Sequence, residues 1–133
     1  MAPAACDTII QNLEDFERKE TDYDRIITGD LGYVGQSILF DLMRGKEHDI
    51  KINHMDCGMQ IFDEESQDTH AGGSGCACSA LMLSAVILPK LASGEWKRVL
   101  FVPTGALLSQ VSANEGRTIP AIAHAVWLES GKE

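Results

Sequence analysis

The sequence has no cluster of basic residues, no long hydrophobic run and no leader pattern. Its 133 residues carry 20 acidic side chains against 11 Lys and Arg, a formal net charge of −9. Nucleic-acid binding needs a concentrated basic surface, so we expect no nucleic-acid partner. The longest mostly apolar stretch, Cys76 to Pro89, is too short to span a bilayer. Because the first basic residue is Arg18, no basic region precedes an apolar core as in a signal peptide.

Cysteine is scarce, and its spacing fits none of the familiar metal or redox motifs. One residue separates Cys76 from Cys78, so the pair is neither a C-x-x-C motif nor half of a zinc ribbon. A zinc site could be assembled only from His54, Cys57, Cys76 and Cys78, which lack a known ligand spacing. We therefore expect four reduced thiols, including Cys6, and neither a metal nor a cofactor.

What is present is the composition of a globular protein: 44% of the residues are hydrophobic and 23% charged. Periodicity predicts helices at 3–19, after the turn at 29–35 and at 81–88, and strands at 25–28, 59–62, 99–102 and 119–128. Residues 63–68 and 112–117 are expected to be surface loops. The order predicts one α/β domain over residues 1–133, with a mixed, mostly parallel sheet flanked by helices and an antiparallel terminal strand pair.

Residue patterns also predict which elements are buried. The helix at 81–88 is apolar on all sides and should be buried on most of them, with Pro89 kinking it or removing one hydrogen bond. The strand at 99–102 is continuously apolar, as in the middle of a sheet covered on both faces. In the last strand an alanine face leaves room for a helix to lie close. His124, among aliphatic neighbours, is interpreted as a core histidine.

Two glycine-rich turns are the candidate sites. The first, Gly29 to Gly35, follows a strand and opens a helix, but it matches neither the dinucleotide motif nor a P-loop. The second, Gly72 to Ser79, leads small side chains and two thiols into a helix. A helix N-terminus offers N–H donors and partial positive charge, so either turn could supply donors to an anion, and the second could also stabilise a thiolate. Alternatively, the small residues of the second turn simply let the helix that follows it cross the sheet closely.

Several segments resemble the stage V sporulation protein AD family, in the family's order and almost from end to end. They are Met1–Ala5, Ile27–Gly32, Asp56–Gly58, Ala71–Ala80, Thr104–Ser109 and Ile119–Val126. The resemblance covers only the C-terminal half of that family, which is itself similar to the thiolase and ketoacyl synthase superfamily. It implies a thiolase-like C-terminal domain, cut from a longer parent protein just after its first strand.

The resemblance implies binding rather than catalysis. Where a ketoacyl synthase has a His-containing turn, this chain offers Gly29 and Asp30, and His70 is the nearest analogue of the thiolase histidine. The family is understood to bind dipicolinic acid and to support its uptake into the developing spore, so no catalytic residue is expected. The ligand-binding residues are predicted to be Asp30, Gly32, His70, Gly73, Ser74, Cys76 and Cys78. The alternative is one half of an acyl-transfer enzyme that uses a cysteine in the missing N-terminal half.

The resemblance also implies partners and a location. The expected partners are dipicolinic acid, other stage V sporulation A proteins, the N-terminal half of the same protein and further copies of it. The expected location is peripheral, at the inner membrane of the spore.

Overall fold

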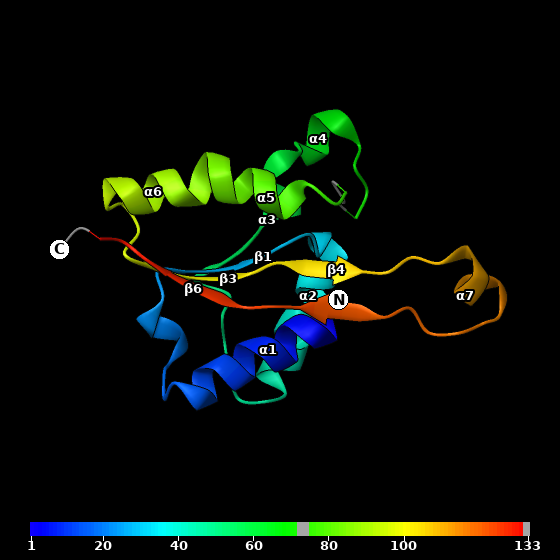
Figure 1. Cartoon of the computed structure of the whole chain (residues 1–133), viewed down its shortest axis with the longest axis horizontal. Helices are drawn as coiled ribbons and strands as arrows, with labels where there is room; N and C mark the ends of the chain where they lie inside the picture. The colour runs from blue at the N-terminus through cyan, green and yellow to red at the C-terminus, as the bar shows by residue number, and fades with distance from the viewer. Residues whose placement is uncertain (72–74, 132–133) are drawn as a thin grey trace.

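The computed structural model describes residues 1–71 and 75–131, and a four-stranded sheet lies at its centre (Figure 1). The sheet has the order β2-β1-β3-β6, where β1 spans Arg25–Thr28, β2 His54–Asp56, β3 Arg98–Val102 and β6 Val126–Glu129. Strand β1 runs parallel to β2 and β3, and β6 runs antiparallel to β3. The prediction of a mixed, mostly parallel sheet with an antiparallel terminal strand pair is confirmed.

Helices cover both faces of this sheet (Figure 1). Helices α1 (Ala2–Asp15) and α2 (Gly32–Arg44) pack on one face, where Leu100 and Val102 of β3 join their core. Helices α5 (Cys78–Met82) and α6 (Leu88–Ser93), joined by the π-helical turn η2 (Leu83–Ile87), pack on the other face, where Val99 and Phe101 point. Strand β3 is therefore buried on both faces, as its sequence predicts. None of the helices among the described residues has the length and apolarity to cross a membrane.

The two principal helical predictions are corrected in part. Cys6, Ile9 and Leu13 of α1 are buried as expected, but the helix ends at Asp15 and Phe16 is exposed. The helix expected at 81–88 extends over 78–93 and buries Met82, Ile87 and Leu91 against the sheet. Its Leu81 and Leu88 are exposed, so the helix is covered on one side of this chain rather than on most sides. The π-turn ends just before Pro89, which lacks the N–H for a regular ladder.

The strand expected at 59–62 is wrong. Those residues fall in α3 (Cys57–Ile61) and in the connection that follows it, and the strand is β2, three residues earlier. A short, mostly apolar run such as residues 59–62 does not distinguish a strand from one turn of helix. In the acidic segment that follows, Asp63 and residues 65–68 are exposed as expected, but the segment forms a single helical turn, α4 (Glu64–Gln67), after Asp63. A short 3-10 turn, η1 (Glu20–Asp22), precedes β1.

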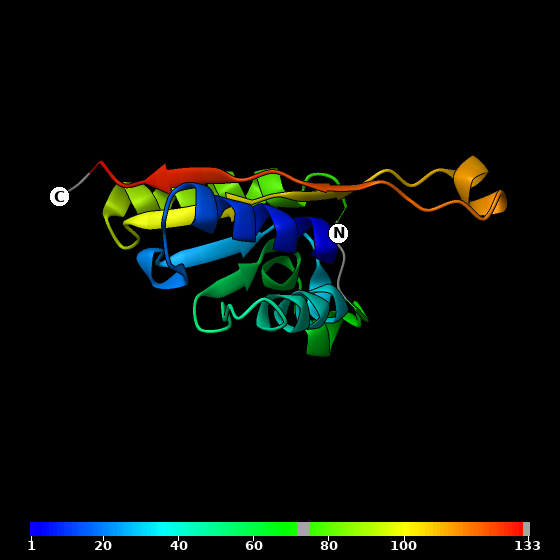
Figure 2. The same cartoon turned by 90° about the horizontal axis from the view of Figure 1, so that it is seen from below.

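The chain between β3 and β6 forms an arm that projects from the body (Figure 2). Its base is the antiparallel pair β4 (Thr104–Ala106) and β5 (Ala121–Ala123), and its far end carries α7 (Gln110–Asn114) where a loop was expected. The strand expected at 119–128 is thus split into β5 and β6. Ala123 and Ala125 of its alanine face do lie on α1, where the Thr8 hydroxyl donates to the Ala123 carbonyl at 2.9 Å, but Ala121 is exposed.

His124 is not a core histidine. It lies at the break between β5 and β6, where its side chain is exposed and its backbone N–H donates to the Pro103 carbonyl at 3.3 Å. The neighbours that share its sheet face, Ile122 and Val126, are themselves about half exposed. The aliphatic pattern around His124 therefore does not correspond to a buried face in this chain.

Candidate functional site

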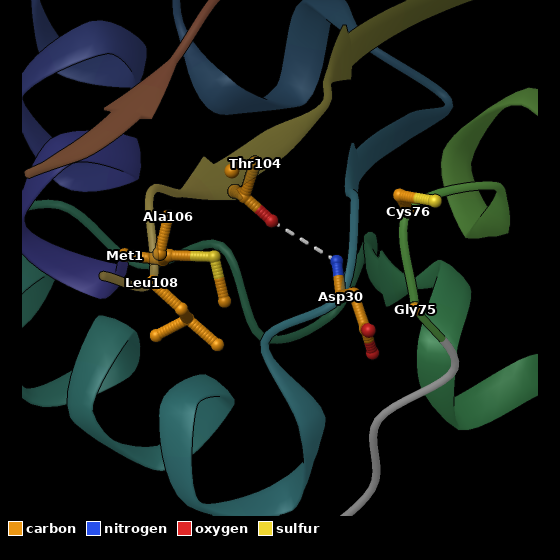
Figure 3. A pocket seen from close by; sticks show the side chains of 8 residues that line it. Met1, Asp30, Gly75, Cys76, Thr104, Ala106 and Leu108 are labelled. Atoms are coloured by element: carbon orange, nitrogen blue, oxygen red, sulfur yellow. Dashed lines mark hydrogen bonds between the residues drawn. The ribbon is translucent and has the colours of Figure 1, made fainter. Parts of the chain in front are cut away.

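A pocket of about 440 Å³ opens where the carboxyl ends of β1 and β3 meet the start of the α5 helix (Figure 3). Asp30 enters it from the turn after β1, and Cys76 enters from the segment before α5. The backbone N–H of Asp30 donates to the Thr104 hydroxyl at 3.0 Å, which ties the β1 turn to β4. The described residues that line the pocket are Met1, Asp30, Gly75, Cys76, Thr104, Gly105, Ala106 and Leu108.

The structure brings two of the predicted ligand-binding residues, Asp30 and Cys76, to the same pocket. Cys78 lies outside the lining and is buried, where its thiol donates to the Gly29 carbonyl at 3.3 Å. His70 lies on the surface, 84% exposed, with Nδ1 3.3 Å from a carboxylate oxygen of Asp68. The predictions for Gly73 and Ser74 fall outside the described residues.

The remaining predicted residue, Gly32, contacts a carboxylate of the protein itself. Asp56, 1% exposed, accepts the backbone N–H of Leu31 at 2.9 Å and that of Gly32 at 3.1 Å. The next N–H, from Tyr33, donates to the Ala71 carbonyl at 2.8 Å. The donors expected at the start of α2 are thus engaged within the chain.

Asp56 also belongs to a buried network of side chains from β1, β2 and α2. The Thr28 hydroxyl donates to Asp56 Oδ1 at 2.6 Å and lies 3.0 Å from His54 Nε2. On the other side of the ring, His54 Nδ1 lies 3.0 Å from Gln36 Nε2, and Phe40 packs edge-on against the ring at 5.1 Å. Burial lowers the pKa of His54 to about 4, so the imidazole is neutral at pH 7.

Two glycines allow these groups to approach each other. A Cβ on Gly29 would lie 2.5 Å from the Thr104 backbone N and 2.6 Å from Ser79 Oγ. A Cβ on Gly58 would lie 2.0 Å from Asp30 Oδ1. Gly29 therefore lets β1, β4 and α5 converge, and Gly58 makes room for the Asp30 side chain.

Burial disfavours the thiolate form of two of the buried cysteines, Cys57 and Cys6. Burial, together with the nearby Cys78, Asp56 and Asp30, raises the pKa of Cys57 to about 12, so this thiol stays protonated at neutral pH. Cys6 and Cys78 are buried as well, and burial with the nearby Asp7 raises the pKa of Cys6. Cys76 is exposed and faces the pocket. No disulfide joins the four cysteines, as predicted.

Five lining residues lay outside the predicted site and its two glycine-rich turns: Met1, Thr104, Gly105, Ala106 and Leu108. Thr104, Ala106 and Leu108 belong to the segment Thr104–Ser109, which the motif resemblance already singled out. Asp56 likewise begins the segment Asp56–Gly58. The available signal was therefore membership in a matching segment, because nothing in the local pattern shows that Thr104 lies beside Asp30.

The lining sets what the pocket can do chemically. Among the described residues that line it, Asp30 supplies a carboxylate, Cys76 a thiol and Thr104 a hydroxyl, while Ala106 and Leu108 supply apolar surface. Lys, Arg and His are absent from that described lining. An anionic ligand would need a cation or N–H donors from elsewhere, because like charges repel in a partly buried site.

Comparison with known proteins agrees with the motif resemblance. A family model described as stage V sporulation protein AD matches residues 1–129. The stage V sporulation protein AD of Bacillus subtilis is 46% identical over 129 residues. That alignment covers 97% of this chain and 38% of the relative, so the chain spans little more than a third of the relative's length.

Proposed function

The chain belongs to the stage V sporulation protein AD family, and from this premise we propose that it forms part of a non-catalytic binding site for dipicolinic acid. Family membership gives it a role in sporulation. The bound molecule, a planar pyridine dicarboxylate, is the part we propose. We further propose that the domain is a thiolase-like C-terminal half that has lost condensation chemistry.

The observation that carries this proposal is the pocket between the Asp30 turn and β4. It opens at the carboxyl ends of the parallel strands β1 and β3, the edge where α/β sheets bind ligands. Its volume of about 440 Å³ is within the usual range for small-molecule sites. The turn carries Gly29 and Asp30 where a condensing enzyme would need a histidine, which supports binding without turnover.

The charge of the lining leads to a second part of the proposal. Because Asp30 would repel a dianion, the positive groups that neutralise dipicolinate must come from outside the described lining. We place them in the part of the longer relative that this chain does not span. Other stage V sporulation A proteins and further copies of the chain are proposed partners, with a peripheral location at the inner spore membrane.

The test is calorimetric titration of dipicolinate into this chain and into the full-length Bacillus subtilis relative. Isophthalate keeps both carboxylates but lacks the ring nitrogen, and it controls for general anion binding. We expect binding by the full-length relative and by a chimera of it that carries residues 1–129 of this chain in place of the matching segment. In the chimera, Thr104→Ala should weaken binding about fivefold and the arm variant Thr118→Ala should leave it unchanged. Absence of binding at millimolar dipicolinate, or equal binding of isophthalate, would rule the proposal out.

The apolar part of the lining favours one alternative, an acyl-transfer half that accepts an acyl chain beside Ala106 and Leu108. This alternative draws its nucleophilic cysteine from the part of the relative beyond this chain and needs His70 as the polarising group. His70 lies outside the lining of the pocket. Mass spectrometry of the full-length relative after incubation with an acyl coenzyme A would detect the covalent adduct that this alternative requires.

A further inference from the structure

The hydrogen bonds around Thr28 have a fixed direction. Both oxygens of Asp56 accept backbone N–H groups, from Leu31 and Gly32, so this side chain acts as an acceptor. The Thr28 hydroxyl donates its single hydrogen to Asp56. Toward His54, at 3.0 Å, the same hydroxyl can then only accept.

This direction assigns the tautomer of His54. Since Thr28 accepts on one side of the ring, Nε2 must carry the hydrogen. In the neutral ring Nδ1 is then an acceptor, which matches the Gln36 amide nitrogen 3.0 Å away. Gln36 lies on α2 one turn after Gly32, so the network holds α2 at two points: at its first N–H groups through Asp56 and one turn later through His54.

The network connects to the pocket through the turn that it holds. Asp30 lies between Thr28, which is fully buried at the end of β1, and Leu31, whose N–H is bonded to Asp56. On its pocket side the same turn is joined to β4, where the Asp30 N–H donates to the Thr104 hydroxyl. We infer that Thr28 is a positioning residue, whose hydroxyl joins His54 to Asp56 and thereby sets the place of Asp30 in the pocket.

The inference deepens the proposed function, since it concerns the same pocket, but its first readout needs no ligand. The variant is Thr28→Val, which keeps the shape of the side chain and removes the hydroxyl, and Thr28→Ser restores the hydroxyl. Ile27→Val is the matched control, because Ile27 is equally buried on the same strand and points to the opposite face of the sheet. All four proteins are labelled with ¹⁵N and compared by nuclear magnetic resonance at pH 7.

We expect the wild-type His54 ring to show the Nε2–H tautomer. In Thr28→Val its share should fall by about half, because Nε2–H loses its acceptor while Gln36 can turn its carbonyl toward Nδ1. The Asp30 and Leu31 amide signals should move with it. Thr28→Ser and Ile27→Val should retain the wild-type tautomer and amide positions. An unchanged His54 or Asp30 signal in Thr28→Val, or failure of Thr28→Ser to restore it, would overturn the inference.

The second readout is the dipicolinate affinity of the full-length relative in which residues 1–129 of this chain, with the same substitutions, replace the matching segment. Because Asp30 is displaced, the dipicolinate affinity of Thr28→Val should differ from that of the unsubstituted protein by about fivefold. The affinity of Thr28→Ser should differ by less than twofold. If the tautomer and amide signals respond but dipicolinate does not bind even the wild type, the proposed function fails and the positioning role stands. If dipicolinate binds and Thr28→Val leaves its affinity unchanged, the positioning role fails and the proposed function stands.

Discussion

The two glycine-rich turns look alike in the sequence, yet the structure uses them in opposite ways. Each leads into a helix and each offers backbone donors. At the start of α2 the donors of Leu31 and Gly32 are bonded to the buried Asp56. At the start of α5, Gly75 and Cys76 face the pocket, and Cys76 is exposed. The helix end of the first turn is therefore a packed joint, although Asp30 of the same turn faces the pocket, and the second turn is a pocket wall.

The difference arises from residues far away in the sequence. Asp56, on β2, supplies an internal carboxylate at the place where an anionic ligand would otherwise bind the α2 N-terminus. Thr104, 74 positions from Asp30, accepts the Asp30 N–H and so joins the first turn to β4. A glycine-rich turn before a helix thus indicates an anion site only where no carboxylate of the protein already fills it.

The largest effect on stability is expected when one methyl group is added to the first turn, and it can be compared with the same change in the second turn. In Gly29→Ala the Cβ would lie 2.5 Å from the Thr104 backbone N and 2.8 Å from its hydroxyl, so we expect a loss of about 3 kcal/mol in unfolding free energy. In Gly75→Ala nothing lies within 4 Å, and the cost comes only from the positive φ of 82°, about 1 kcal/mol. Urea unfolding measures both.

Gly105→Ala is the matched control on β4, because its Cβ would make an ordinary contact of 3.7 Å with Ile122. It should leave the unfolding midpoint nearly unchanged. Equal losses in Gly29→Ala and Gly75→Ala would show that the two turns are packed alike, contrary to the structure.

The next largest effect is expected from removing the internal carboxylate. Asp56→Ala leaves the N–H groups of Leu31 and Gly32 and the Thr28 hydroxyl without an acceptor in a buried site, so we expect a loss of about 2–3 kcal/mol. Asp63, which caps α4 through Ser66 at the surface, is the control. Asp63→Ala should cost far less, and a comparable loss would mean that burial does not set the strength of the Asp56 contacts.

Much of the fold could be predicted because its signals are local. The stripe of Cys6, Ile9 and Leu13 and the apolar run of β3 mark a helix and a central strand without knowledge of the rest. Strand β2 could not be predicted in this way. Two of its three residues, His54 and Asp56, are polar, and they are accommodated only because Thr28 and the start of α2 bond to them.

The same contrast between local signals and long-range contacts applies to the candidate site. The glycines and thiols near Asp30 and Cys76 attract attention in the sequence because they are unusual, and the structure brings these two residues together. His70 also looks unusual, but its surface position becomes visible only once the chain is folded. Thr104 looks ordinary, and its role depends on a contact with Asp30 across 74 positions. The residue types that could bind a ligand can be recognised in the sequence. Which of them meet in one pocket is seen only in the structure.

A smaller effect, on ligand affinity, should follow from removing the charge of Asp30, which faces the pocket. Asp30→Asn removes the carboxylate that faces a dianion. Dipicolinate should therefore bind the full-length relative that carries this chain's residues 1–129 about fivefold more tightly at low salt when Asp30 is replaced. Asp68→Asn, at an exposed surface position, is the control and should change little. Calorimetry at two salt concentrations measures both. Weaker binding by Asp30→Asn would instead identify Asp30 as a group that attracts the ligand, for instance through a shared cation.

The smallest effect concerns pH and contrasts Asp56 with Asp24, at the opposite end of β1. Asp24 also accepts two backbone N–H groups, from Lys97 at 2.6 Å and Arg98 at 2.7 Å. Burial alone would raise the pKa of Asp24, but the Arg98 and Lys97 N–H groups and the nearby Arg98 and Arg25 charges lower it below its ordinary value. For Asp56 burial prevails, and its pKa is raised although Thr28, Leu31 and Gly32 donate to it.

These opposite shifts give opposite pH dependences. Because the pKa of Asp24 is lowered on folding, its stabilising contribution is complete above its ordinary pKa of 3.8 and is lost as the pH falls through the folded value. The pKa of Asp56 is raised, so its contribution is complete below 3.8 and declines as the pH rises through the folded value. The stability difference between wild type and Asp24→Asn should therefore grow from pH 2 to about pH 5, while that for Asp56→Ala should shrink with rising pH. If the two stability differences changed with pH in the same direction, the opposite pKa shifts of Asp24 and Asp56 would be contradicted.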